Sequence, residues 1–146
     1  MYLPGENDRL IVLDGFPPME SGSPLPNVRA HDGVVVVDYF THQFGVDTNT
    51  RARVVFRHVR AHYLGWPNDE ALSAHPLYGR GLRPYDAFEV IDSSWKATII
   101  AANRAHPLHR DEHFAADRHF IMTFHDETFE CIARTVEVET LTQDQG

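Results

Sequence analysis

Hydrophobic and polar residues alternate along residues 119–139, and this alternation predicts a β-hairpin. Successive side chains of a strand point to opposite faces, so every second residue shares a face. A type I turn at residues 125–128 gives the pairs Phe124–Phe129, Met122–Cys131 and Phe120–Ala133. One face of this hairpin is therefore expected to lack polar groups, with Cys131 as a small buried hydrophobe.

The opposite face of the same hairpin is mixed in polarity. The expected register places His119 opposite Arg134, Ile121 opposite Ile132 and Thr123 opposite Glu130. A shift of one residue would bury the polar groups and expose the phenylalanines, so the pattern opposes such a slip. We expect the mixed face to line a cleft.

A second hairpin is predicted from two stretches rich in β-branched residues, 33–44 and 51–63, which are joined by turn-forming residues at 47–50. One face of its second strand becomes polar toward the end and carries Val54, Phe56, His58, Arg60 and His62. Shorter strands are expected at residues 9–14 and 86–91. Residues 15–32 contain many prolines, glycines and serines, so an irregular loop is expected there.

Helix signals lie between the predicted hairpins. Asn68 is a suitable N-cap for a short helix that ends before His75 and Pro76. A longer helix is expected from a cap within residues 92–94 to residue 104, and a further short helix over residues 109–118. One stripe of the longer helix holds Trp95, Ile99 and Ala102. We expect this stripe to pack on the apolar face of the last hairpin.

These elements predict an α+β fold, in which a mostly antiparallel sheet is built from hairpins and carries one main helix and one or two short helices. An open sheet with helices on one side is the first expectation, and a small barrel is the alternative. The 146 residues fit a single globular domain over 1–146. Frayed ends are expected at residues 1–8 and 141–146.

Charge and composition narrow the expected partners. The formal net charge is −8, from 21 acidic and 13 basic residues, so a nucleic-acid backbone would be repelled. The sequence has no apolar stretch of membrane-spanning length and no signal peptide pattern, and it has one cysteine. A cytoplasmic protein is therefore expected, with no nucleic-acid or membrane partner. An edge strand would allow a homodimer.

Histidine is the outlier in composition, with 10 residues. It exchanges protons and binds metals near neutral pH, so its abundance suggests either role. If the 51–63 strand joins the sheet of the last hairpin, their polar faces meet. The candidate catalytic residues are then His58, His62, His119 and Glu130. The candidate substrate-binding residues are Arg60, Arg134 and Thr123.

The string His109-Arg110-Asp111-Glu112-His113 is an H-x-x-E-H pattern. In these five residues only, the chain resembles the inverted zinc proteases. On a helix, His109 and His113 would share a face and could reach one zinc ion, with Glu112 beside them as a base. The pair is therefore the candidate metal site, and a metal site outside protease chemistry is favoured over a protease.

Two classes of function follow from these features. The first is a small enzyme that applies general acid–base chemistry to a polar or anionic small molecule, as an isomerase or lyase without a cofactor. The second is a non-catalytic acidic module, of the inhibitor or immunity type, that binds a basic protein and has dispersed histidines. A metal-dependent protein using His109 and His113 is a further alternative.

Overall fold

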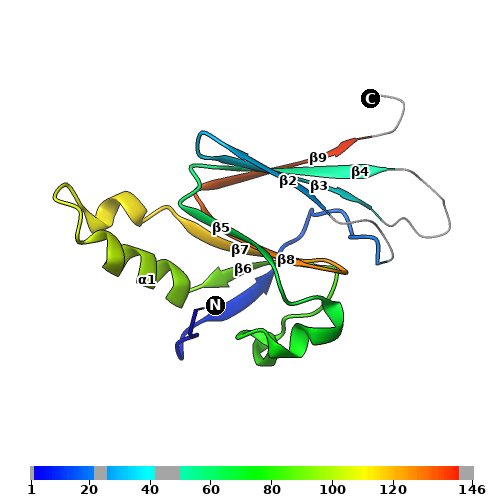
Figure 1. Cartoon of the computed structure of the whole chain (residues 1–146), viewed down its shortest axis with the longest axis horizontal. Coiled ribbons are helices and arrows are strands. Elements are labelled where there is room, and N and C mark those ends of the chain that lie inside the picture. Colours follow the sequence, from blue (N-terminus) through cyan, green and yellow to red (C-terminus); the bar gives the residue numbers. More distant parts are fainter. Residues whose placement is uncertain (1, 22–25, 42–49, 142–146) are drawn as a thin grey trace.

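The computed structural model describes residues 2–21, 26–41 and 50–141, and these residues form nine strands in two antiparallel sheets (Figure 1). The larger sheet has the order β1-β6-β7-β8-β5, and the smaller sheet has the order β2-β3-β4-β9. With one α-helix and short 3-10 turns beside them, the sheets confirm the predicted α+β class. The predicted turn at residues 47–50 lies almost wholly outside the described residues.

The elements have the following bounds. The larger sheet contains β1 (Arg9–Val12), β6 (Ala87–Ile91), β7 (Arg118–Thr123), β8 (Thr128–Ala133) and β5 (Ala61–Gly65). The smaller sheet contains β2 (Asn27–His31), β3 (Val34–Phe40), β4 (Arg51–Arg57) and β9 (Thr135–Leu141). The helix is α1 (Ser94–Asn103), and the 3-10 turns are η1 (Asp69–Ala74), η2 (Tyr78–Arg80) and η3 (Asp111–Phe114). Because β2 lies within residues 15–32, the prediction of an irregular loop throughout that segment was wrong.

The hairpin of β7 and β8 forms with a register two residues away from the expected one. Phe120 lies opposite Cys131, and Met122 lies opposite Phe129. The difference arises in the turn, where the Phe124 N–H donates to the Glu127 carbonyl at 2.9 Å and leaves a two-residue loop. A shift of two residues keeps every side chain on its face, so the apolar face survives the correction.

The predicted strand over residues 51–63 is broken at His58, whose φ of 55° turns the chain out of the smaller sheet. The residues before it form β4, and the residues after it form β5 at the edge of the larger sheet. The chain changes sheet again at Arg134, between β8 and β9, and the Arg134 N–H donates to the Arg57 carbonyl at 3.0 Å. The two crossings thus lie side by side and connect the layers.

The apolar face of the β7–β8 hairpin packs against the smaller sheet, which lies above it in Figure 1. The centroid of the Phe56 ring of β4 lies 5.3 Å from that of the Phe120 ring and 5.4 Å from that of the Phe129 ring. The expected packing of the Trp95 stripe on this face was therefore wrong. Trp95 contacts His119 on the opposite face, at 5.0 Å between ring centroids. The observed architecture is two stacked sheets, so it is neither the open single sheet nor the small barrel that the sequence led us to expect.

The face of the larger sheet that points away from the smaller sheet is also covered. Phe88, Val90 and Ile121 from the strands pack there with leucines from the segment around η1 and η2, namely Leu72, Leu77 and Leu82. The N-terminal segment and α1 cover the same side, since Tyr2 and Leu10 join this core and Tyr2 stacks on Trp95 at 5.7 Å. Tyr2, Gly5 and Asp8 are thus held by hydrogen bonds rather than frayed, although Leu3 between them is 88% exposed. Residues 142–146 lie outside the described part.

Substitution of Phe56, whose ring packs between the two sheets, tests this packing. Phe56→Ala should reduce the free energy of unfolding by about 3–5 kcal/mol, because Phe56 is fully buried and its removal leaves a cavity between two sheets. Urea denaturation measures the change. Val12→Ala, at a side chain that is 42% exposed, is the control and should change stability by about 0.5 kcal/mol or less. Equal effects of the two substitutions would contradict the stacked-sheet core.

Candidate functional site

Glu130 of β8 carries a carboxylate in the interior of the protein, with 1% of the residue exposed. His119 of β7 lies diagonally across the same sheet face, since Ile121 is the residue directly opposite Glu130. The His119 Nε2 atom lies 2.7 Å from the Glu130 Oε1 atom, and His119 is fully buried. The alternation of β7 and β8 therefore brings an imidazole and a carboxylate into contact inside the fold.

A second imidazole reaches Glu130 from the segment that follows η1. The His75 Nε2 atom lies 2.8 Å from Glu130 Oε2, and the Leu77 N–H donates to His75 Nδ1 at 3.0 Å. Since Nδ1 accepts a hydrogen bond, it carries no proton. The proton of the neutral His75 ring is then on Nε2, where it is donated to the carboxylate.

Two further hydroxyl groups complete what we name the Glu130 cluster, which consists of Tyr2, His75, Ser93, His119 and Glu130. The Tyr2 hydroxyl donates to Glu130 Oε1 at 2.7 Å. The Ser93 Oγ atom lies 2.7 Å from His119 Nδ1, on the side of the ring away from Glu130. The cluster thus joins residues from the N-terminal segment, the η1 segment, the start of α1 and two strands.

The position of Ser93 is set by the turn between β6 and α1. Asp92 has a φ of 54°, which turns the chain sharply at the end of the strand. Ser93 then caps α1, because its Oγ atom accepts the Lys96 N–H at 3.1 Å. The next residue is fixed by Asp8, whose buried carboxylate accepts the Ser94 hydroxyl at 2.6 Å. The Ser93 hydroxyl is thereby held between the helix start and His119.

The electrostatics of the cluster favour an ionised carboxylate. Burial raises the pKa of Glu130, but hydrogen bonds from His119 and His75 outweigh burial and lower that pKa to about 2. Burial and the adjacent Glu130 charge raise the pKa of the Tyr2 phenol well above its usual range, so Tyr2 remains a donor. An ionised Glu130 can only accept, so His119 carries a proton on Nε2. In the neutral His119 ring, Nδ1 is then free to accept the Ser93 hydroxyl proton.

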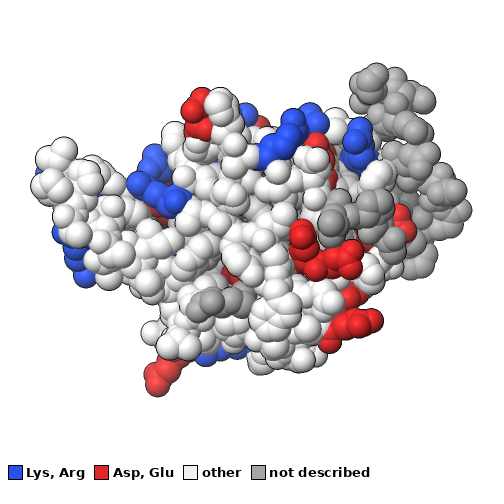
Figure 2. Space-filling view, in the orientation of Figure 1, with Lys and Arg blue, Asp and Glu red and all other residues white. Residues whose placement is uncertain are grey.

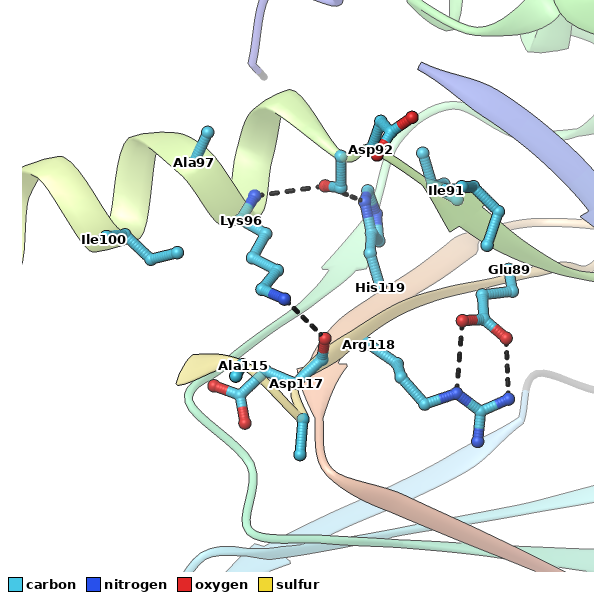
Figure 3. A pocket seen from close by; sticks show the side chains of 13 residues that line it. Glu89, Ile91, Asp92, Lys96, Ala97, Ile100, Ala115, Asp117, Arg118 and His119 are labelled. Carbon is cyan, nitrogen blue, oxygen red and sulfur yellow. Dashed lines mark hydrogen bonds and ion pairs between the residues drawn. The ribbon is translucent and has the colours of Figure 1, made fainter. Parts of the chain in front are cut away.

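Ser93 and His119 lie on the wall of a cavity of about 530 Å³, which we name the Ser93 cavity. It is bounded by β6, α1 and residues 115–119, as Figure 3 shows. Lys96 extends across it and donates to the Asp117 carbonyl at 2.9 Å, while Arg118 and Glu89 form an ion pair at 2.6 Å on its other side. A hydroxyl–imidazole–carboxylate chain therefore ends at an open, charged cavity.

Only two of the four predicted catalytic residues belong to this cluster, His119 and Glu130. His58 is exposed at the crossing between the sheets. His62 lies opposite Cys131, so it occupies the sheet face opposite to that of Glu130. The expectation that the strand over residues 51–63 would bring both histidines to Glu130 was wrong, because that strand breaks and changes sheets.

The predicted substrate-binding residues lie elsewhere. The Arg60 Nε atom lies 2.9 Å from the buried carboxylate of Asp117, and the Arg134 Nε atom lies 3.7 Å from it. The Thr123 hydroxyl donates to the Arg83 carbonyl at 2.8 Å and fixes the loop before β6. These side chains thus have structural partners, and none of them contacts the Glu130 cluster.

The predicted metal pair does not share a helix face. Arg110 is extended, and η3 begins only at Asp111, so His109 lies before the turn and His113 within it. The His109 ring instead contacts Asp111 at 2.5 Å and Asn103 at 2.8 Å. Within the described ranges, no group of three or more histidine, cysteine, aspartate or glutamate side chains could hold a metal ion.

Three members of the cluster, Tyr2, His75 and Ser93, were not among the predicted site residues. Each carried a simpler local interpretation: Tyr2 in a frayed end, His75 at the end of a short helix and Ser93 as a cap. The mixed face of the β7–β8 hairpin was the one available signal, because a glutamate and a histidine within a strongly apolar hairpin need buried partners.

No family model, curated protein or solved structure matches this chain. The site is therefore interpreted from its own geometry and chemistry. No helix in the described part is long and apolar enough to cross a membrane. On the face shown in Figure 2, basic side chains lie mainly over the upper part and the left, and the largest group of acidic side chains lies at the right. The acidic module that binds a basic protein stays a prediction based on the net charge of −8.

A second carboxylate–imidazole contact lies outside the cluster, at the tip of the β7–β8 hairpin. The Asp69 carboxylate accepts the His125 Nδ1 proton at 2.8 Å and also binds the Tyr85 hydroxyl. The hydrogen bond to Asp69 raises the pKa of His125 and, on the other side, raises the pKa of Tyr85 to about 12. The contact ties the predicted turn at residues 125–128 to η1.

Acid titration tests the ionised state of Glu130. Its pKa is lower in the folded chain, about 2, than the usual 4.5, so the unfolded chain takes up the proton first as the pH falls. The stabilisation, roughly 3 kcal/mol, is present above pH 4.5 and is lost toward pH 2. In urea denaturation at several pH values, the free energy of unfolding of Glu130→Gln should depend less steeply on pH than that of the wild type. Glu112→Gln, at an exposed position, should behave as wild type, and identical profiles for all three proteins would contradict the assignment.

Proton NMR tests the contact between His125 and Asp69. Because the pKa of His125 is raised in the folded chain, its stabilising effect is full below the ordinary pKa of 6.5 and is lost as the pH rises through the folded value. Asp69→Asn should move the titration midpoint of His125 down toward 6.5. The signals of the other histidines should keep their positions. An unchanged His125 midpoint would show that Asp69 does not stabilise the imidazolium.

Proposed function

We propose that this protein is a small enzyme that applies acid–base chemistry to a polar molecule bound in the Ser93 cavity. One observation carries the proposal. Ser93 Oγ, His119 and Glu130 form a continuous chain with two contacts of 2.7 Å, and its hydroxyl end lies on the cavity wall. The histidine and carboxylate chemistry expected from the sequence is retained, and its location and partners are new.

The order of the groups favours nucleophilic acyl transfer. A hydroxyl bonded to an imidazole that is oriented by a carboxylate is the arrangement that activates serine nucleophiles. Ser93 Oγ would attack a carbonyl carbon while its proton passes to His119 Nδ1, and His119 would then protonate the leaving group. Water would release the acyl group from Ser93 by the reverse proton path. Hydrolysis of an ester or amide thus replaces the isomerase or lyase reaction as the first candidate.

Of the charged residues that line the cavity, Lys96 is the one that supports an anionic group on a polar substrate, while Asp92 adds a negative charge. Lys96 uses one of its three ammonium protons for the Asp117 carbonyl, which leaves two for a bound molecule. Arg118 lies nearby and is paired with Glu89, so the larger part of its charge is already balanced. A small acyl compound with a carboxylate near Lys96 is the substrate class that these groups support.

Substitution of Ser93 tests the proposal with two matched variants. Ser93→Asn keeps a side-chain acceptor for the helix cap but removes the nucleophile, so hydrolysis of p-nitrophenyl acetate should fall on the order of 10³-fold. Ser93→Thr keeps both the cap and the hydroxyl and should retain measurable activity. A fluorophosphonate should label Ser93 in the wild type, as peptide mass spectrometry would show.

Ser73→Ala is the control for this experiment, because Ser73 is an exposed serine of η1 away from the cavity. Both its rate of hydrolysis and its labelling at Ser93 should match those of the wild type. Circular dichroism would verify that Ser93→Asn is folded. Full activity in folded Ser93→Asn, or absence of label from Ser93, would overturn the proposal.

A further inference from the structure

A second cavity, of about 320 Å³, lies beside the Glu130 cluster. We name it the aromatic cavity, and its lining residues are Tyr2, Tyr63, Trp95, Thr98 and Glu130. Tyr63 lies directly opposite Glu130 on β5, so both side chains are on the same sheet face. Trp95 and Thr98 come from one turn of α1. Three aromatic side chains and one carboxylate therefore surround the same space.

The aromatic walls are fixed in place by their contacts. The Tyr2 and Trp95 rings stack with an interplanar angle of 8° and a centroid distance of 5.7 Å. The Tyr63 hydroxyl donates to the Trp66 carbonyl at 2.8 Å, which anchors the ring at the sheet edge. Tyr63 is 37% exposed, so the cavity opens to solvent along this residue.

The carboxylate in this cavity is held by hydrogen bonds from three side chains. Its hydrogen-bond partners are the Tyr2 phenol and the imidazoles of His75 and His119. Among the described residues, no lysine or arginine forms an ion pair with Glu130. The Tyr2 phenol, whose pKa is raised, stabilises the negative charge without cancelling it, and the carboxylate remains an acceptor for a cation in the neighbouring space.

The number of hydrogen bonds at the carboxylate leaves a position for a donor. Glu130 Oε1 accepts from two groups, Tyr2 and His119, whereas Oε2 accepts from His75. A carboxylate offers about four acceptor positions, so one remains on Oε2. Aromatic faces attract cations through the negative charge above the ring, and they also stack on aromatic ligands.

We propose that the aromatic cavity binds a primary alkylammonium ion attached to an aromatic or apolar group. The ammonium would donate to Glu130, and the attached group would lie between Tyr63 and Trp95. A volume of about 320 Å³ suits a ligand of the size of an arylalkylamine. This binding site goes beyond the proposed reaction at Ser93, because it needs no chemistry in the Ser93 cavity.

Fluorescence of Trp95 provides the test. The chain has two tryptophans, so Trp66→Phe leaves Trp95 as the single indole, and Trp66 is 54% exposed and outside the cavity lining. Titration with benzylamine, which is protonated at neutral pH, should quench Trp95 in a saturable way. Benzyl alcohol has nearly the same shape without the charge and should bind at least about tenfold more weakly.

Variants of Tyr63 separate a specific site from general apolar binding. In the Trp66→Phe background, Tyr63→Ala should weaken benzylamine binding about tenfold, whereas Tyr63→Phe keeps the ring and should bind within about twofold of the parent. Equal affinity for benzylamine and benzyl alcohol, unchanged binding by Tyr63→Ala, or no saturable quenching would each overturn the proposal. Because the readout is binding, an inert Ser93 would leave this result unaffected.

Discussion

The buried negative charge of Glu130 is the constraint on which the arrangement around the larger sheet depends. An ionised carboxylate in the interior is costly unless donors surround it, and three side chains from separate segments supply them. Tyr2 must therefore lie against the larger sheet, and His75, just after η1, must be placed where its ring reaches Glu130. The charge thus couples the folding of the N-terminal segment and the η1 segment to the β7–β8 hairpin.

The two crossings between the sheets make this arrangement possible. Because the chain changes layers at His58 and again at Arg134, the smaller sheet covers the apolar face that carries Phe120 and Phe129. The opposite face, with His119 and Glu130, is then left for α1, the η segments and the N-terminal residues. A fold with α1 on the apolar face would have left Glu130 either exposed or without its partners.

Sequence patterning predicted those features that depend on neighbouring residues. The alternation in β7 and β8 correctly assigned the two faces, and Asn68 and Ser93 are observed as helix caps. The register depended on a two-residue loop, which the acidic residues of the turn do not specify. His75 joins Glu130 across 55 residues of sequence, and such a contact has no local pattern. The chain crossing at His58 likewise depends on a positive φ, which few non-glycine residues adopt and which no local pattern indicates here.

Glu130 also connects the two proposed sites, because it lines the aromatic cavity and contacts His119 at the edge of the Ser93 cavity. A cation bound beside Glu130 would attract part of the carboxylate charge that now accepts the His119 Nε2 proton, and this hydrogen bond is the one that leaves His119 Nδ1 facing Ser93. Conversely, a ligand of the Ser93 cavity that strengthens the chain from Ser93 through His119 to Glu130 would leave less of the carboxylate charge for the cation. Thermodynamic linkage requires the two effects to be equal in free energy, so ligands of the Ser93 cavity and of the aromatic cavity would change each other's affinity by the same factor.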